Sequence, residues 1–154
     1  MCGIAGVVNA AGVTKDDVWK MIDCIKYRGV DEQGVEDLGG AVLGHARLAV
    51  VDPENGMQPM SSTDGKVWVV FNGEIYNFIE LREQLKAKGY KFKSRCDTEV
   101  LVHLWCEKGE KMLDDLVGMF AFFIWDQRTQ TGMPASDRQG IKPCFSYPYQ
   151  GGVE

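Results

Sequence analysis

Residues 1–8 read MCGIAGVV, an apolar run whose second residue is a cysteine. A small side chain after Met1 allows the initiator to be removed, which leaves Cys2 with a thiol and a free α-amine on one residue. An α-amine ordinarily titrates at about 7.7 to 8.0, so near neutral pH it can take the thiol proton. Cys2 could then be nucleophile and base together. The plainer alternative is that Cys2 only begins an apolar strand over residues 2–8.

The composition around this stretch is that of an ordinary globular protein. The 154 residues are 45% hydrophobic and 25% charged, which suits a single domain over residues 1–154 with one buried core. The net charge of -5, from 17 basic and 22 acidic residues without a basic run, argues against a nucleic-acid partner. We expect a small soluble ligand instead.

The same composition predicts where the protein resides. The longest apolar stretch, residues 119–125, is far shorter than the roughly 20 residues of a membrane-spanning helix. No signal peptide precedes it, and the five cysteines form an odd, scattered set, which favours reduced thiols in the cytoplasm. With no CxxC pair and only His45 and His103, we expect no metal and no cofactor, and two structural histidines.

Apolar periodicity predicts strands both before and after helices, which indicates an α+β fold. The expected helices run from the Thr14 and Asp17 capping box to near Gly29, from Asn77, with Glu80 at the capping-box position, to Gly89, and from Asp97 to Gly109. The expected strands are 2–8, 40–51, 57–62, 66–71 and 119–126, with a hairpin turn at residues 64–65. Pro134 cannot donate to a strand ladder, so its segment should be an edge or irregular.

Five short strings carry a resemblance to a known family: MCGIAG (1–6), YRG (27–29), GHARLAVVD (44–52), FNGEIYN (71–77) and CDTE (96–99). Together they resemble the glutaminase domain of class II glutamine amidotransferases, which are N-terminal nucleophile enzymes. The run 72–77 looks like asparagine synthetase rather than the members that aminate phosphosugars. The resemblance covers about residues 1–143 and implies a four-layer αββα sandwich. Because the family's domain continues with further strands, we expect the fold to be incomplete at its C-terminus.

The chemistry of amide hydrolysis explains the residue types in these strings. Attack of a Cys2 thiolate on the glutamine side-chain amide forms an oxyanion, which requires donors already in place. Asn72 supplies a side-chain N–H and Gly73 a closely approaching backbone N–H, and the resemblance implies this same pair. Collapse would release ammonia and leave a thioester for water to hydrolyse. The alternative for residues 72–73 is a strand-ending Asn-Gly turn.

Free glutamine also carries an α-carboxylate and an α-ammonium, so its pocket needs a cation and an acid. Arg47 can bind the carboxylate bidentately, whereas Asp97 and Glu74 can receive the ammonium, as the matching family positions do. Backbone groups near Leu48, Val50 and Val51 should line the pocket, and Arg28 should support the site. The alternatives are a surface ion pair for Arg47 and a helix N-cap for Asp97.

The chain departs from the family pattern at Val30, where proline is usual, and at Ser136 and Gln139. No Ser-Gly-Gly-x-Asp-Ser loop occurs, so we expect the synthetase domain to be absent and ammonia to pass to a separate synthetase domain or subunit. Two other functions remain open: an inactive amidotransferase-like module that senses glutamine or binds a partner, and an N-terminal cysteine amidase for another substrate. A homodimer is also left open.

Overall fold

Two antiparallel sheets and three α-helices form the described part of the chain, residues 1–10, 12–50 and 52–148 of a computed structural model. In chain order the elements are β1 (Gly3–Val8), α1 (Lys15–Ile25), the 3-10 helix η1 (Lys26–Arg28), β2 (Glu32–Asp37), β3 (Ala41–Arg47), β4 (Met60–Ser61), β5 (Val67–Ile75), α2 (Phe78–Ala87), α3 (Thr98–Lys108), η2 (Gly109–Asp114), β6 (Gly118–Asp126) and β7 (Thr131–Ser136).

The first sheet has the strand order β1-β3-β2, with β3 in the centre. Its two registers run from Gly3↔Ala46 to Val8↔Ala41 and from Glu32↔Arg47 to Asp37↔Val42. The second sheet has the order β4-β5-β6-β7, and the long pair β5 and β6 is in register from Val67↔Asp126 to Ile75↔Gly118. Strands β1 and β3 therefore belong to one sheet and β5 to the other.

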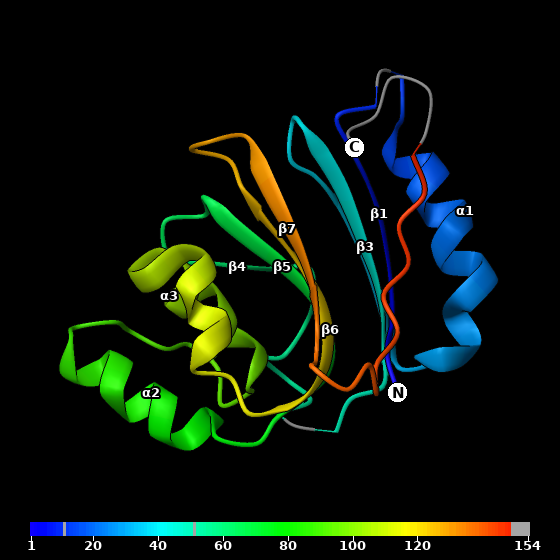
Figure 1. Ribbon diagram of the computed structural model, residues 1–154. Helices are drawn as coiled ribbons and strands as arrows, with labels where there is room; N and C mark the ends of the chain where they lie inside the picture. Colours follow the sequence, from blue (N-terminus) through cyan, green and yellow to red (C-terminus); the bar gives the residue numbers. More distant parts are fainter. Residues whose placement is uncertain (11, 51, 149–154) are drawn as a thin grey trace.

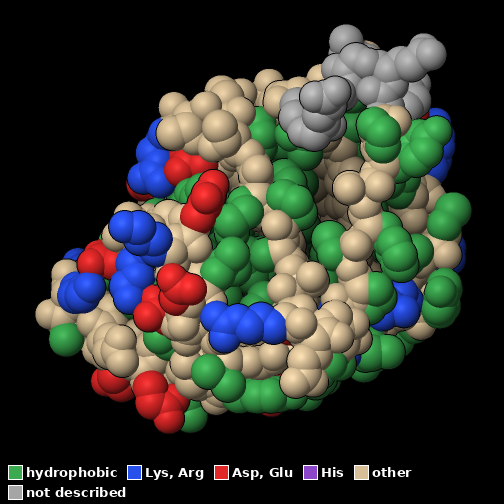
Figure 2. All heavy atoms as spheres, in the orientation of Figure 1, with side chains coloured by type: hydrophobic (Ala, Val, Ile, Leu, Met, Phe, Trp, Pro, Cys, Tyr) green, Lys and Arg blue, Asp and Glu red, His purple; other side chains and the backbone are tan. Residues whose placement is uncertain are grey.

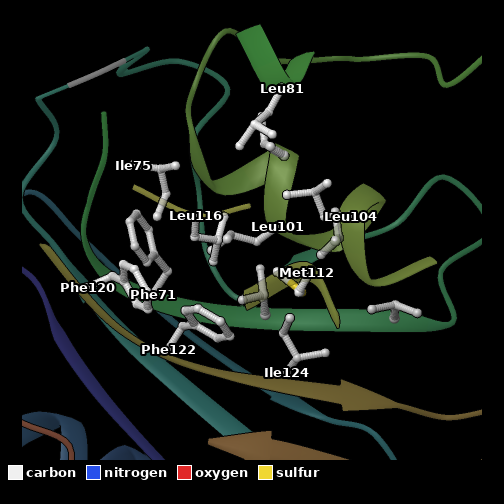
Figure 3. Close-up of a cluster of buried hydrophobic side chains, with 14 of the residues drawn as sticks. Phe71, Ile75, Leu81, Leu101, Leu104, Met112, Leu116, Phe120, Phe122 and Ile124 are labelled. Carbon is white, nitrogen blue, oxygen red and sulfur yellow. The ribbon is translucent and has the colours of Figure 1, made fainter. Parts of the chain in front are cut away.

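The four layers are helix, sheet, sheet and helix, as the resemblance implied (Figure 1). Helix α1 covers the first sheet, and α2 and α3 cover the second. Figure 3 shows the core between the second sheet and its helices, where side chains of β5 and β6 meet those of α2, α3 and η2. The labelled members of this core are Phe71, Ile75, Leu81, Leu101, Leu104, Met112, Leu116, Phe120, Phe122 and Ile124.

A separate cluster packs the two sheets against each other. It consists of Leu38, Ala41, Leu43, Val70 and Trp125. Because side chains alternate along a strand, Val67, Val69 and Phe71 of β5 face the helices while Val70 faces the first sheet. The same alternation directs Asn72 toward the first sheet, where Cys2 precedes β1.

Several element predictions are confirmed. The strand 2–8 appears as β1, the three helices form, and Gly89 follows α2 with a φ of 96°, which suits its left-handed cap. The capping box at Thr14 is present, because the Asp17 carboxylate accepts bonds from the Thr14 backbone N–H at 3.1 Å and hydroxyl at 2.9 Å. Within the described residues, β7 with Pro134 is an edge strand of the second sheet, as expected.

Other element predictions need correction. The strand predicted over 40–51 ends at Arg47, the strand predicted over 57–62 is reduced to β4, and β2 was not predicted at all. Asn77 precedes α2, but its side chain does not cap that helix; it donates to the Asp115 carbonyl at 2.8 Å and accepts from the Val117 N–H at 3.1 Å. Asn77 therefore fastens α2 to the loop before β6.

Candidate active site

Cys2 lies at the end of the first sheet and joins three segments. Its backbone nitrogen donates to Asn72 Oδ1 at 3.1 Å, and its Sγ lies 3.8 Å from the Leu48 carbonyl oxygen. Arg28, on η1, donates from Nε to the Cys2 carbonyl oxygen at 3.1 Å. The half-buried thiol thus sits among β5, the loop after β3 and η1.

Asn72 lies on β5, buried and paired with Ala121. Because the Cys2 nitrogen is a donor, the atom of Asn72 that faces it must be the amide oxygen, which turns Nδ2 away from Cys2. In the part of the chain that the structure describes, Nδ2 has no hydrogen-bond partner within the protein. An N–H donor therefore remains available beside Cys2.

Gly73 follows Asn72 where β5 and β6 lie close together. A Cβ at this position would collide with the Met119 carbonyl oxygen and with the backbone of Phe120. The glycine is required by this approach of the two strands. Residues 72 and 73 are an internal part of β5, so the Asn-Gly turn considered from sequence is wrong.

Arg47 ends β3 and is only 4% exposed. Its Nη1 forms an ion pair with Glu32 Oε2 at 2.6 Å and donates to the Pro53 carbonyl at 2.8 Å, and Nη2 donates to the Asp52 carbonyl at 2.8 Å. Arg47 does form an ion pair, as the alternative had it, but the guanidinium is buried and does not lie on the surface. It fastens the loop after β3 to the first sheet.

That loop, residues 48–57, is held from two further sides. The Ala49 N–H donates to Asp31 Oδ2 at 2.7 Å, and Asp52 Oδ2 accepts from the Arg95 N–H at 2.6 Å. Leu48 and Val50 are exposed on it, whereas Val51 lies outside the described residues. The loop therefore bridges Cys2 and the segment that leads to Asp97.

Asp97 precedes α3 and is buried, and its Oδ2 accepts from the Ile75 N–H at 3.0 Å. Asp97 occupies the N-cap position of α3, as the alternative interpretation of the sequence had it, but its side chain makes no capping bond to that helix. Burial raises the pKa of the Asp97 carboxyl above its usual value; the bond from Ile75 opposes this shift, and the nearby charge of exposed Glu74 adds to it. Two neighbouring carboxylates of this kind favour a cation between them.

Two structurally important acids were missed by the sequence reasoning. Glu99, in the first turn of α3, accepts from the backbone N–H groups of Lys93 at 2.8 Å and Ser94 at 2.7 Å and from the Ser94 hydroxyl at 2.6 Å. Burial by itself would raise the pKa of Glu99, but the contacts with His103, Ser94 and Lys93 together lower it to about 2. Glu99 thereby holds the segment that ends at Asp97.

Asp137 organises the turn after β7. Its carboxylate accepts from the backbone N–H groups of Phe120, Gln139, Ile141 and Lys142, at 3.1, 3.1, 2.9 and 3.0 Å. These bonds hold its pKa at about 2, although burial opposes them. The signal available in the sequence was the Asp-x-x-Gly spacing to Gly140, which has a φ of 66°.

His45 has a structural role between the two sheets. His45 is fully buried, with Nε2 3.1 Å from the Phe71 carbonyl oxygen, and its burial lowers its pKa to about 4. It thus joins β3 to β5 across the two sheets. Over residues 1–10, 12–50 and 52–148, no group of three His, Cys, Asp or Glu side chains is arranged to hold a metal ion, and no helix is long and apolar enough to cross a membrane.

An open hollow of about 530 Å³ lies elsewhere, lined by Asp52, Glu54, Asn55, Arg82, Lys86, Phe92, Lys93, Ser94 and Arg95. Charged side chains of both signs cover the side of the molecule that carries α2 and α3 (Figure 2). None of the residues predicted for catalysis or for glutamine binding lines this hollow. We therefore place the candidate active site at Cys2 and Asn72, the residues predicted as nucleophile and oxyanion donor.

Comparisons with known proteins identify the family of the chain. The family model described as a glutamine amidotransferase domain matches residues 1–153. Asparagine synthetase [glutamine-hydrolyzing] 1 of Bacillus subtilis is 42% identical over 150 residues, and asparagine synthetase [glutamine-hydrolyzing] 2 of Oryza sativa subsp. japonica is 40% identical over 148 residues. These alignments cover 94% of this chain but only 24% and 25% of those proteins, so the chain spans about a quarter of the length of these relatives.

Solved structures share the fold. Glutamine phosphoribosylpyrophosphate amidotransferase from B. subtilis superimposes with a TM-score of 0.68 at 22% identity, covering 82% of this chain and 35% of that one. An allosteric regulatory enzyme of purine biosynthesis gives a TM-score of 0.54 at 29% identity, covering 68% of this chain and 25% of that one. The fold is accordingly the sandwich of N-terminal nucleophile amidotransferases. By its sequence, the chain belongs to the glutamine amidotransferase domain family.

Proposed function

We propose that the chain hydrolyses L-glutamine to L-glutamate and ammonia, with Cys2 as the nucleophile. The observation that carries this proposal is the 3.1 Å bond between the Cys2 nitrogen and Asn72 Oδ1. It joins the nucleophile to a side chain whose Nδ2 is available for a developing oxyanion. Residues 1–154 would act as one glutaminase domain.

The reaction starts once Met1 has been removed. The α-amine of Cys2 takes the thiol proton, and the thiolate attacks the glutamine side-chain carbonyl carbon. Asn72 Nδ2 and the Gly73 N–H bind the oxyanion of the tetrahedral intermediate. Its collapse breaks the carbon–nitrogen bond, and the leaving nitrogen takes the proton from the α-ammonium and departs as ammonia. Water, with the α-amine as base, then hydrolyses the γ-glutamyl thioester and restores the thiol.

Glutamine is bound through both of its charged ends. Asp97 and Glu74 receive the α-ammonium, and this cation offsets both the burial of the Asp97 carboxylate, which raises its pKa, and the smaller repulsion from Glu74. Arg47 binds the α-carboxylate while its bonds to the Asp52 and Pro53 carbonyls hold the loop in place. Backbone groups at Leu48 and Val50 line the same pocket; Val51, predicted with them, lies outside the described residues.

The ammonia would pass to a synthetase domain or subunit. Relatives that are several times longer are named glutamine-hydrolysing asparagine synthetases, which favours an asparagine-forming reaction as the destination. A cytoplasmic location and a homodimer remain predictions.

The proposal is tested by intact mass spectrometry after incubation with the glutamine-mimicking electrophile 6-diazo-5-oxo-norleucine. The expected product is protein without Met1 that carries one adduct, with no adduct on Cys2→Ala. Cys24→Ala is the matched control, because Cys24 is an exposed cysteine on α1, and it should be labelled like the wild type. Glutamate release from glutamine should follow the same order.

Other outcomes would contradict the enzyme. Folded protein that retains Met1, or that forms no adduct, would argue against a glutamine-hydrolysing cysteine. Thermal stabilisation by glutamine without any adduct would favour the inactive, glutamine-sensing module. A glutamine-hydrolysing enzyme should lose glutamine binding in Arg47→Ala. If this variant kept the full amide-hydrolysing activity of the wild type, an amidase for another substrate would be favoured instead.

A further inference from the structure

Lys142 is a buried cation in an otherwise exposed segment. Its exposed fraction is 7%, whereas all other residues of 138–148 are exposed. The backbone N–H of Lys142 donates to Asp137 Oδ2, and the same oxygen accepts from the Phe120 N–H of β6. Phe120 is the register partner of Gly73. Lys142 is therefore anchored to the strand that lies beside the proposed oxyanion donors.

The ammonium of Lys142 has an unusual partner. Its Nζ lies 3.1 Å from Met1 Sδ, and a thioether is a weak acceptor. In the described ranges of the chain, no carboxylate lies within ion-pair distance of this Nζ. A lysine that is more than nine-tenths buried ordinarily requires a counter-charge or a good acceptor. Neither is present, so structural stability alone does not account for its position.

The partner is also part of the residue whose removal the proposed function requires. Met1 Sδ is separated from the Cys2 nitrogen by five covalent bonds, so the Lys142 ammonium lies at most about 10 Å from that nitrogen. Once Met1 is removed, this nitrogen becomes the α-amine of the nucleophile. The ammonium would then face the amine without the methionine between them.

We propose that Lys142 keeps the α-amine of Cys2 neutral near neutral pH. This inference rests on the proposed function. A fixed positive charge disfavours a second positive charge nearby, so the amine gives up its proton more readily and can accept the proton of the thiol. Lys142 acts through Cys2 and does not contact glutamine. It is a positioning residue for the proton and not a catalytic one.

Other charged groups also lie at this end of the sheets. Arg28 reaches the Cys2 carbonyl from η1 and is a second cation near the nucleophile. Arg47, at the end of β3, is paired with Glu32 and the loop carbonyls. The nearby acids are Asp97, which is bonded to Ile75, and exposed Glu74, both of which the proposed function assigns to the ammonium of glutamine. Lys142 is the cation that contacts Met1, whereas Arg28 is bonded to Cys2 itself and is unchanged in every Lys142 variant.

The test compares Lys142→Met, which removes the charge and keeps much of the shape, with Lys142→Arg, which restores a charge. The control is Lys93→Met, because Lys93 is an exposed lysine outside the proposed active site. The α-amine is titrated by NMR in protein labelled with ¹⁵N-cysteine. The expected result is a midpoint about one pH unit higher in Lys142→Met, near the wild-type value in Lys142→Arg, and unchanged in Lys93→Met.

Kinetics provide the second readout. The acidic limb of the kcat/KM profile for glutamine should move upward by the same amount, so that Lys142→Met loses about tenfold in rate well below the midpoint and little at pH 9. If Lys142→Met does not fold, Lys142→Gln takes its place. A rate loss that is equal at every pH would indicate a structural role and overturn the inference.

The two hypotheses can fail separately. An α-amine midpoint unchanged in Lys142→Met, in protein that hydrolyses glutamine, overturns the role of Lys142 and leaves the proposed function intact. A processed wild-type protein that does not hydrolyse glutamine overturns the proposed function, while the NMR titration still decides whether Lys142 acts on the amine. Retention of Met1 in the folded protein overturns both.

Discussion

Replacement of Glu99 by glutamine should destabilise the protein in a pH-dependent manner. The pKa of Glu99 is lowered from 4.5 to about 2, because the contacts with His103, Ser94 and Lys93 outweigh the opposing effect of burial. At about 1.4 kcal/mol per unit, this difference corresponds to about 3 kcal/mol of stability at neutral pH. Glutamine retains one acceptor oxygen but presents an N–H₂ group to backbone donors, so most of this stability should be lost.

The sign of the pH dependence follows from the lowered pKa. Above pH 4.5 the carboxylate is charged in both the folded and the unfolded state, and its full stabilising effect is present. As the pH falls from about 4.5 to about 2, the unfolded state takes up the proton first and the stabilisation disappears. The free energies of unfolding of wild type and Glu99→Gln should therefore differ by about 3 kcal/mol at pH 7 and converge near pH 2.

Urea unfolding at pH 7, 5, 4 and 3 measures this difference in the free energy of unfolding. In thermal unfolding at pH 7, the Tm of Glu99→Gln should be about 6 to 10 °C below that of the wild type. Glu107→Gln is the matched control, since Glu107 is a partly exposed acid in the last turn of the same helix, bonded to Lys88 and Tyr90. It should cost much less stability than Glu99→Gln, because ion pairs of exposed side chains contribute little. An equal loss in both variants, or a loss in Glu99→Gln that is the same at pH 3 as at pH 7, would refute the argument.

Three further predictions concern the oxyanion donor, the sheet contact and the core. Asn72→Ala should lower kcat for glutamine by about 10²- to 10³-fold with a much smaller change in KM, and an unchanged kcat would exclude an oxyanion role. Burial holds the pKa of His45 at about 4 against an ordinary 6.5, so wild type should lose about 2 kcal/mol more stability between pH 7 and pH 5 than His45→Gln, as measured by urea unfolding. The wild type loses stability on acidification because only the unfolded state readily takes up the proton. If the free energies of unfolding of wild type and His45→Gln ran parallel between pH 7 and pH 5, the burial argument for His45 would be wrong. Phe122→Ala, at a fully buried position of β6, should cost about 3 to 5 kcal/mol, whereas a cost below about 1 kcal/mol would mean that this core is loosely packed.

Strong hydrophobic periodicity made the main elements of the fold predictable. The apolar runs at β1 and β6 and the helical spacing of α1 and α3 each appear where they were expected. Strand β2 was missed because its sequence, Glu32–Asp37, has a single buried hydrophobic residue, Val35, among charged and small ones. An edge strand of this kind forms because its neighbour β3 offers backbone partners, which its own sequence does not reveal.

Because strand β2 was not predicted, the ion-pair partner of Arg47 could not be predicted either. Glu32 and Arg47 are register partners on β2 and β3, so the ion pair between buried Arg47 and half-buried Glu32 exists only if β2 is present. Short motifs identified candidate residues by their chemistry, but the partners of those residues depend on register. The same holds for Glu99 and Asp137, whose carboxylates bind backbone N–H groups of turns that show no periodic pattern.

The proposed nucleophile and the proposed oxyanion donor belong to different sheets, so the geometry of the site depends on how the sheets pack. Cys2 continues β1 of the first sheet, and Asn72 is part of β5 of the second. Their 3.1 Å contact therefore depends on the distance between the sheets, which is fixed by Leu43, Val70 and Trp125 and by the bond of His45 to Phe71. A catalytic bond of this length tolerates little displacement. The packing between the sheets is thus a requirement of the chemistry as well as of the fold, and His45, which is fully buried and bonded to the residue before Asn72, serves both.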